Sequence, residues 1–191
     1  ETMNVNPKIV IGHSLGAMIA GAYAAISNPK LEVLILANPA NGYGKATPKE
    51  RSEKLRYRLK MIRDLGPVIM AEERSENLLS SNPNAEALEL VKWNMRKVTV
   101  RGYEQASYTL SEGNLSGSAA EYTGRVLVLC GDEDEVTPVA ACRNVAHAYS
   151  NAPIQVLKKL GHATYVEGPD QFNETVEGFL KTVDIQLEKK L

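Results

Sequence analysis

The chain has 191 residues, of which 43% are hydrophobic and 24% charged, and its formal net charge is −1. This composition provides a sizeable core and no extended surface of one charge, so we expect no nucleic-acid partner. Apolar runs end well before the roughly 18 residues that a membrane-spanning helix requires, so we also expect no membrane partner.

The first predicted elements are a strand and a helix joined by a serine turn, the segment Gly-His-Ser-Leu-Gly at residues 12–16. A Cβ atom at Gly12 or Gly16 would crowd the strand against the helix in such a turn. A serine hydroxyl is a weak nucleophile by itself and needs a base and oxyanion donors. The pattern therefore favours Ser14 as a nucleophile, and the alternative is an ordinary serine in a glycine-rich turn.

A second apolar strand is predicted at residues 32–37, and a long segment without strands follows it. Thr47, Pro48 and Glu50 form a capping box with proline at the first helical position, and Gly66 with Pro67 breaks the helical pattern. Apolar residues then recur at helical spacing. We expect helices over residues 48–65, 68–79, 85–98 and 103–110, which form an insertion between two strands.

Two later strands are each followed by polar residues. The apolar run at residues 125–130 predicts a buried strand, and Asp132 and Asp134 come directly after it. A last strand at residues 154–157 leads into a loop that contains His162. The chain order is thus serine, aspartate, histidine, with each group just past the end of its own strand.

On these residues the chain resembles the α/β-hydrolases. Within that family, residues 38–44, the helical insertion and the segment Gly-His-Ala-Thr-Tyr-Val-Glu-Gly-Pro at residues 161–169 look most like the enol-lactonases and ring-cleavage-product hydrolases. The resemblance implies that Ser14 is the nucleophile and His162 the general base. It also implies that Asp134 is the acid, through the pattern Gly-x-x-Asp-x-x-x-Pro at residues 131–138, while Asp132 remains the competing candidate.

The resemblance implies an α/β fold: the C-terminal half of an α/β-hydrolase parallel sheet with an inserted helical cap. We expect residues 1–44 to form hydrolase core with the serine turn, residues 45–120 to form the cap, and residues 121–191 to complete the core. Trp93, Met70 and Val136 are candidates for substrate binding. The alternative for the two cap residues is simple packing of helix on helix.

Only eleven residues precede Gly12, whereas α/β-hydrolases place several strands there. The strand before the serine turn would then be a bare edge of the sheet. We expect the N-terminal half of the fold to be a separate or disordered piece of the same assembly, and the alternative is an incomplete fragment. The N–H of Leu15 would supply one oxyanion donor, and the second donor usually comes from the absent loop.

The resemblance implies hydrolysis of an ester, a lactone or an activated C–C bond in a small molecule. Ala163 follows the histidine where the C–C hydrolases often carry an aromatic residue, which favours an ester or lactone. Two alternatives stay open: a cofactor-free acyltransferase or perhydrolase with the same three residues, and a non-catalytic ligand-binding member of the fold.

The remaining histidines, cysteines and basic residues suggest no further chemistry. Three histidines at these spacings predict no metal site, we expect no cofactor, and His13 is expected to pack or to contact substrate beneath the turn. Cys130 and Cys142 are expected to be buried and without a disulfide, which fits a reducing, cytoplasmic compartment. The basic residues interleave with acidic ones and predict a solvated helix face: Lys49, Arg51, Lys54, Arg56, Arg58, Lys60 and Arg63.

Overall fold

A computed structural model describes residues 6–27 and 30–183 of the chain. Residues 1–5, 28–29 and 184–191 are not described, so the outer ends of the expected segments 1–44 and 121–191 lie outside the described residues. Within the described residues, none of the helices combines the length and the apolar character needed to cross a membrane.

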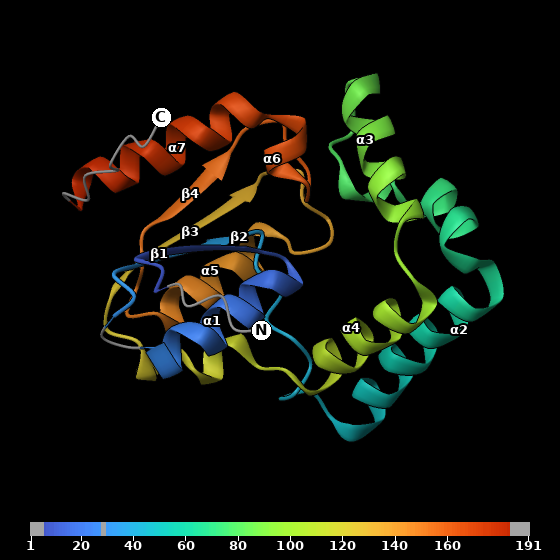
Figure 1. Cartoon of the computed structure of the whole chain (residues 1–191), viewed down its shortest axis with the longest axis horizontal. Coiled ribbons are helices and arrows are strands. Elements are labelled where there is room, and N and C mark those ends of the chain that lie inside the picture. The colour runs from blue at the N-terminus through green and yellow to red at the C-terminus, as the bar shows by residue number, and fades with distance from the viewer. Residues whose placement is uncertain (1–5, 28–29, 184–191) are drawn as a thin grey trace.

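Four parallel strands form one sheet in the order β1-β2-β3-β4 (Figure 1). They are β1 (Ile9–His13), β2 (Val33–Ala37), β3 (Arg125–Gly131) and β4 (Ile154–Leu157). The register aligns His13 with Ala37, and Ala37 with Leu129. Because all four strands run the same way, their carboxyl ends lie along one edge of the sheet, and the loops that follow them can meet there.

Helices cover both faces of this sheet: α1 (Leu15–Ser27) and α5 (Val139–Ala148) lie on one face and α7 (Pro169–Thr182) on the other (Figure 1). Side chains alternate along β2, so that Leu34 and Leu36 pack toward α1 and α5 while Ile35 packs toward α7. A strand buried on both sides reads as a continuous apolar run, as this one does. The short α6 (Thr164–Glu167) precedes α7.

The segment between β2 and β3 forms a helical lobe of α2 (Pro48–Arg74), α3 (Ala85–Arg96) and α4 (Val100–Glu112) beside the sheet (Figure 1). Short 3-10 helices follow α2 and α4: η1 (Glu76–Leu78), η2 (Leu115–Gly117) and η3 (Ala119–Glu121). The predicted start of α2 is confirmed, because the Thr47 side chain accepts a hydrogen bond from the N–H of Glu50.

The ends of the predicted helices need correction. Gly66, with φ of 68° and ψ of 171°, is non-helical and separates two helical segments of α2, so the predicted break at Gly66 and Pro67 is confirmed. The second segment ends at Arg74 and not at residue 79. The helix expected to reach residue 98 ends at Arg96, because Thr99 already caps α4 through a hydrogen bond from the N–H of Gly102. For the same reason α4 begins before residue 103.

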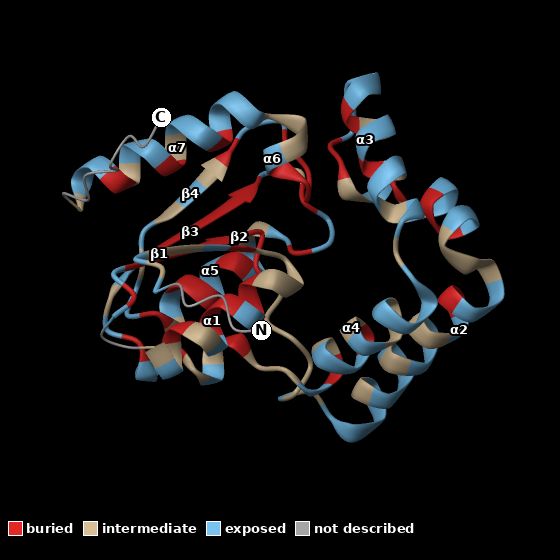
Figure 2. Cartoon of the chain, viewed as in Figure 1, coloured by how far each residue is buried: buried red, intermediate tan, exposed pale blue. Residues whose placement is uncertain are grey.

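Strand β1 forms an open edge of the sheet within the described residues. It is less buried than β2 and β3 (Figure 2), and the side chain of Ile11 is 48% exposed. Ile19 on α1 is 60% exposed. An edge strand presents unpaired backbone N–H and C=O groups, so β1 offers a surface on which another strand can pair.

Candidate active site

The structure brings together Ser14, Asp134 and His162, which follow β1, β3 and β4 respectively. The Ser14 Oγ lies 2.9 Å from Nε2 of His162, and Nδ1 of His162 lies 2.9 Å from Oδ2 of Asp134. Asp134 and His162 are each 4% exposed. A hydroxyl, an imidazole and a carboxylate are thus hydrogen-bonded in series, which allows the imidazole to take a proton from Ser14 while the carboxylate stabilises the resulting cation.

The serine turn holds Ser14 in the left-handed backbone region, with φ of 52°. The Ser14 N–H donates a 3.0 Å hydrogen bond to the carbonyl of Ala37, which fixes the turn against the end of β2. Such a conformation costs a non-glycine residue on the order of 1 to 3 kcal/mol and persists only where the surrounding structure imposes it. The strained turn presents the hydroxyl at the carboxyl edge of the sheet.

The two glycines of the turn differ in how closely other atoms approach them. A Cβ atom at Gly12 would lie 2.5 Å from the carbonyl oxygen of Gly16 and 2.7 Å from Cβ of Ala20, so the expected crowding is confirmed there. At Gly16 the expectation is wrong, because outside its own turn of α1 an added Cβ has no described atom within 4 Å. Only Gly12 is needed for the close approach of β1 to α1.

Both carboxylate oxygens of Asp134 accept hydrogen bonds from the residues that follow it. Its Oδ1 accepts from the backbone N–H groups of Val136 and Thr137, each at 2.8 Å, and its Oδ2 also accepts from the Thr137 hydroxyl at 2.7 Å. Burial alone would raise the pKa of Asp134, but the hydrogen bond and charge of His162, together with the other donors, hold that pKa well below its usual range. Asp134 is therefore ionised at neutral pH.

The competing candidate, Asp132, lies elsewhere. Its Oδ1 accepts a 2.6 Å hydrogen bond from the backbone N–H of Lys159, and its Oδ2 lies 3.3 Å from the Lys158 ammonium. Asp132 therefore stabilises the turn after β4, and Asp134 is the carboxylate that contacts His162.

Asn38, which sequence reasoning missed, supplies the polar group after β2. Its side-chain nitrogen donates a 2.8 Å hydrogen bond to Oδ2 of Asp134, and its side-chain oxygen accepts one of 2.7 Å from the hydroxyl of Thr164. Asn38 is fully buried and has a positive φ of 44°. Its position in the sequence could have indicated this role, because Asn38 directly follows a buried strand and so lies at the same edge of the sheet as Ser14, Asp134 and His162.

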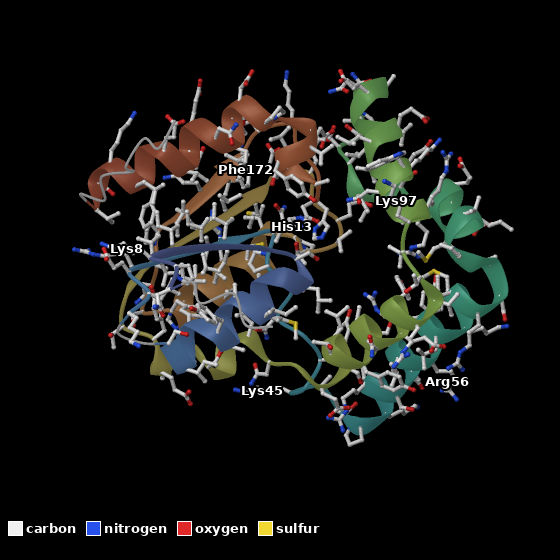
Figure 3. The ribbon with its side chains drawn as sticks, viewed as in Figure 1. Lys8, His13, Lys45, Arg56, Lys97 and Phe172 are labelled. Atoms are coloured by element: carbon white, nitrogen blue, oxygen red, sulfur yellow. The ribbon has the colours of Figure 1, made fainter. Side chains whose placement is uncertain are left out.

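His13 packs beneath the site at the end of β1 that faces the helical lobe, opposite the end marked by Lys8 (Figure 3). Its ring lies 4.8 Å from that of His162 and 5.0 Å from that of Tyr165, between centroids. Burial, reinforced by the neighbouring His162, lowers the pKa of His13 to about 4. His13 is therefore neutral at pH 7, and its Nε2 lies 2.8 Å from the carbonyl oxygen of His162, to which it donates.

The N–H of Leu15, the expected oxyanion donor, lies in the first turn of α1. Leu15 is the first residue of α1, so its N–H has no partner inside the helix, and no other backbone partner is found for it in the described part of the chain. The positive end of the helix dipole lies at the same place. The N–H of Leu15 is thus free to stabilise negative charge next to Ser14.

A cavity of about 460 Å³ opens between the sheet edge and the helical lobe, and both Ser14 and His162 line it. Met70 and Val136, two of the expected substrate-binding residues, line it as well. Its apolar wall also includes Leu78, Met95, Val98 and Leu110. A pocket of this size and character can enclose a small organic molecule and exclude water from the reacting bond.

The third expected substrate-binding residue, Trp93, does not line this cavity. Its side chain is 53% exposed, and the ammonium of Lys97 lies 3.2 Å from the centroid of the indole. Lys97 follows the last residue of α3 and lies at the lower end of that helix in Figure 3. Its size makes Trp93 a candidate from sequence, but the indole lies on the exposed surface of α3.

Metal-ligand clusters and disulfides are absent from the described residues. No group of three His, Cys, Asp or Glu side chains among them could hold a metal ion. Cys130 and Cys142 are both free and fully buried, as expected from their apolar surroundings.

Comparison with known families gives the site its context. The family model described as serine aminopeptidase, S33, matches residues 1–169. The chain belongs to this α/β-hydrolase family. The match covers the serine turn, the helical lobe and the loops that carry Asp134 and His162.

Individual relatives are distant. The chain is 25% identical over 178 residues to 3-oxoadipate enol-lactonase 2 of Acinetobacter baylyi, covering 89% of this chain and 62% of the relative. It is 28% identical over 169 residues to a monoacylglycerol lipase of Mycolicibacterium smegmatis, covering 86% and 58%. The chain thus spans about three fifths of the length of these curated relatives.

Solved structures of α/β-hydrolases share the fold. A malate-bound thermophilic esterase from Thermogutta terrifontis superposes with a TM-score of 0.79 at 22% identity, over 93% of this chain and 65% of that one. MenH from S. aureus gives a TM-score of 0.77 at 20% identity, over 93% and 69%. The parallel sheet with flanking helices is therefore that of an α/β-hydrolase.

Proposed function

We propose that this chain carries the nucleophile, base and acid of a serine hydrolase that cleaves a small carboxylic ester or lactone. The observation that carries the proposal is the pair of 2.9 Å contacts that His162 makes, with Ser14 on one side and Asp134 on the other. The apolar cavity in front of Ser14 and the kinship with an enol-lactonase and a lipase support an ester or lactone substrate.

The proposed reaction has two steps. The Ser14 oxygen attacks the ester carbonyl while its proton moves to Nε2 of His162, and the resulting oxyanion accepts a hydrogen bond from the N–H of Leu15. The alkoxide leaves with the proton from His162, and an acyl-serine ester remains. Water then attacks this ester with His162 as base, the carboxylic acid departs, and the proton returns to Ser14.

The test is hydrolysis of short p-nitrophenyl esters and of a simple γ-lactone by the full-length protein. Ser14→Ala and His162→Ala should each lower kcat by about three or more orders of magnitude, because the residues of such a triad act as a unit. Ser52→Ala, at an exposed serine of α2, is the matched control and should behave as wild type. Ester turnover that survives in Ser14→Ala at the wild-type rate would overturn the proposal.

A covalent probe gives a second readout. A fluorophosphonate reacts with an activated serine, so peptide mass spectrometry should find the label on Ser14 and lose it in His162→Ala. Label spread over surface serines such as Ser52 would contradict an activated nucleophile at Ser14.

We also propose that, in the assembled protein, another strand pairs with the open edge at β1 and that a loop near it supplies the second oxyanion donor. The exposed Ile11 and the partial coverage of the relatives support this. The test is hydrogen exchange in the full-length protein: outward-facing amides of β1 should be protected to the same degree as those of β2. Rapid exchange confined to β1 would contradict the pairing.

A further inference from the structure

Two arginines of α2, Arg58 and Arg74, line the same cavity as Ser14 and His162. Both are partly buried, and no Asp or Glu is among the described residues that line the cavity. From sequence, Arg58 belonged to a basic cluster expected on a solvated helix face. The fold corrects that expectation, because it turns Arg58 toward the cavity.

Three other arginines of the helical lobe have carboxylate partners. Arg51 pairs with Glu112 at 3.4 Å, Arg63 with Glu104 at 2.6 Å, and Arg96 with Glu72. These ion pairs connect α2 with α4 and α3 with α2. The three arginines therefore have a structural role within the lobe.

Arg58 and Arg74 differ from these three. Within the described part of the chain neither forms an ion pair, and the contact recorded for Arg74 is a 3.4 Å hydrogen bond from its Nη1 to the hydroxyl of Tyr57. Arg74 also borders an outer hollow that includes Asp64 and Glu73, whereas Arg58 does not line that hollow. A substitution of Arg58 therefore changes the cavity without changing the lining of the outer hollow.

A partly buried guanidinium without an anion is costly, and a bound carboxylate offsets that cost through two parallel charge-assisted hydrogen bonds. The apolar remainder of the cavity suits the hydrocarbon part of a small molecule. We propose that Arg58, assisted by Arg74, selects substrates that carry a carboxylate apart from the bond that Ser14 attacks. This inference rests on the proposed hydrolase function and specifies its substrate class.

The test compares two esters of equal acyl length, p-nitrophenyl hemisuccinate and p-nitrophenyl butyrate, on the full-length protein. The wild type should favour the hemisuccinate in kcat/KM. Arg58→Met should lower the ratio of the two kcat/KM values by about tenfold to a hundredfold, as expected for loss of a hydrogen bond to a charged group, and Arg58→Lys should restore part of it. Arg74→Met should lower the same ratio.

Arg56 provides the matched control, because it lies on the same helix but points outward from the lobe (Figure 3) and does not line the cavity. Arg56→Met should keep the wild-type ratio. An equal ratio in wild type, Arg58→Met and Arg74→Met, with both esters hydrolysed, would overturn the carboxylate selection and leave the hydrolase proposal intact.

A binding measurement separates the two proposals, since it needs no turnover. In the Ser14→Ala background, calorimetry should detect binding of monomethyl succinate and tenfold or more weaker binding when Arg58→Met is added. Methyl butyrate should show no such dependence on Arg58. Equal affinities of monomethyl succinate for both proteins would overturn the inference, even if neither ester is hydrolysed.

Discussion

The side-chain amide of Asn38 donates a 2.8 Å hydrogen bond to Oδ2 of Asp134, the same oxygen that His162 contacts at 2.9 Å. The side-chain oxygen of Asn38 also accepts from the hydroxyl of Thr164, and its backbone carbonyl oxygen lies 3.1 Å from Oγ1 of Thr137. One buried residue at the end of β2 thus connects the loop that carries the acid with the loop that carries the base.

We predict that Asn38→Gly lowers the free energy of unfolding by about 1 to 3 kcal/mol, because buried partners lose their hydrogen bonds. It should also reduce kcat by on the order of tenfold, since the Asp134 carboxylate is less firmly oriented. Asn38→Ala should lose about 1 kcal/mol more, because alanine tolerates a positive φ less well than glycine. Denaturant unfolding and ester assays measure both effects. Equal stability of the two variants would show that the positive φ at this position imposes no cost on alanine.

The sequence was enough to predict that Ser14, Asp134 and His162 lie together, because each lies in a short pattern directly after an apolar strand and parallel strands end at one edge. It was not enough for Asn38, whose hydrogen bonds join loops about a hundred residues apart. The sequence also did not predict that Arg58 lines the cavity, because packing against other elements decides which face of α2 turns inward. Local periodicity alone does not determine that packing.

Gly12 and Gly16 give a sharper prediction about the serine turn. Gly12→Ala should destabilise the fold by about 3 kcal/mol or more, because its Cβ would overlap the backbone of Gly16 and the side chain of Ala20. The Cβ of Gly16→Ala has no described atom within 4 Å outside its own turn of α1, so this variant should change stability by less than about 1 kcal/mol, with helix propensity in its favour. Thermal unfolding of the two variants side by side checks this. Similar losses at both positions would show that the turn requires two glycines after all.

Acid stability should depend on His13. Its pKa is about 4 in the folded protein, against an ordinary value of 6.5, so between these limits the unfolded chain binds the extra proton and the native state does not. The stabilisation is therefore complete above pH 6.5 and is lost as the pH falls toward 4, at most about 3 kcal/mol for this shift.

We predict that His13→Gln removes most of the change in unfolding free energy between pH 7 and pH 4. Gln retains an N–H donor for the carbonyl of His162 but does not titrate. His147→Gln, at an exposed histidine of α5, is the control and should keep the wild-type slope. Chemical denaturation at several pH values measures the slopes, and an unchanged slope in His13→Gln would contradict this account.

Glu167 ties the loop of His162 to the helical lobe. Its carboxylate accepts a 2.7 Å hydrogen bond from the N–H of Gly161, the residue before His162, and one of 2.9 Å from the N–H of Ser80. The hydroxyl of Ser80 also donates to it. A backbone bond of 2.8 Å from the N–H of Ala163 to the carbonyl of Leu78 continues the same link.

Because both carboxylate oxygens of Glu167 accept hydrogen bonds, an amide in their place must present N–H groups to a donor. We predict that Glu167→Gln loosens this link: the amides of Gly161 and Ser80 should exchange about tenfold faster or more, and kcat should fall as His162 becomes less firmly placed. Glu174→Gln, at an exposed position of α7, should change neither. Faster exchange at Ser80 with wild-type exchange at Gly161 would mean that the lobe, and not the loop of His162, depends on this carboxylate.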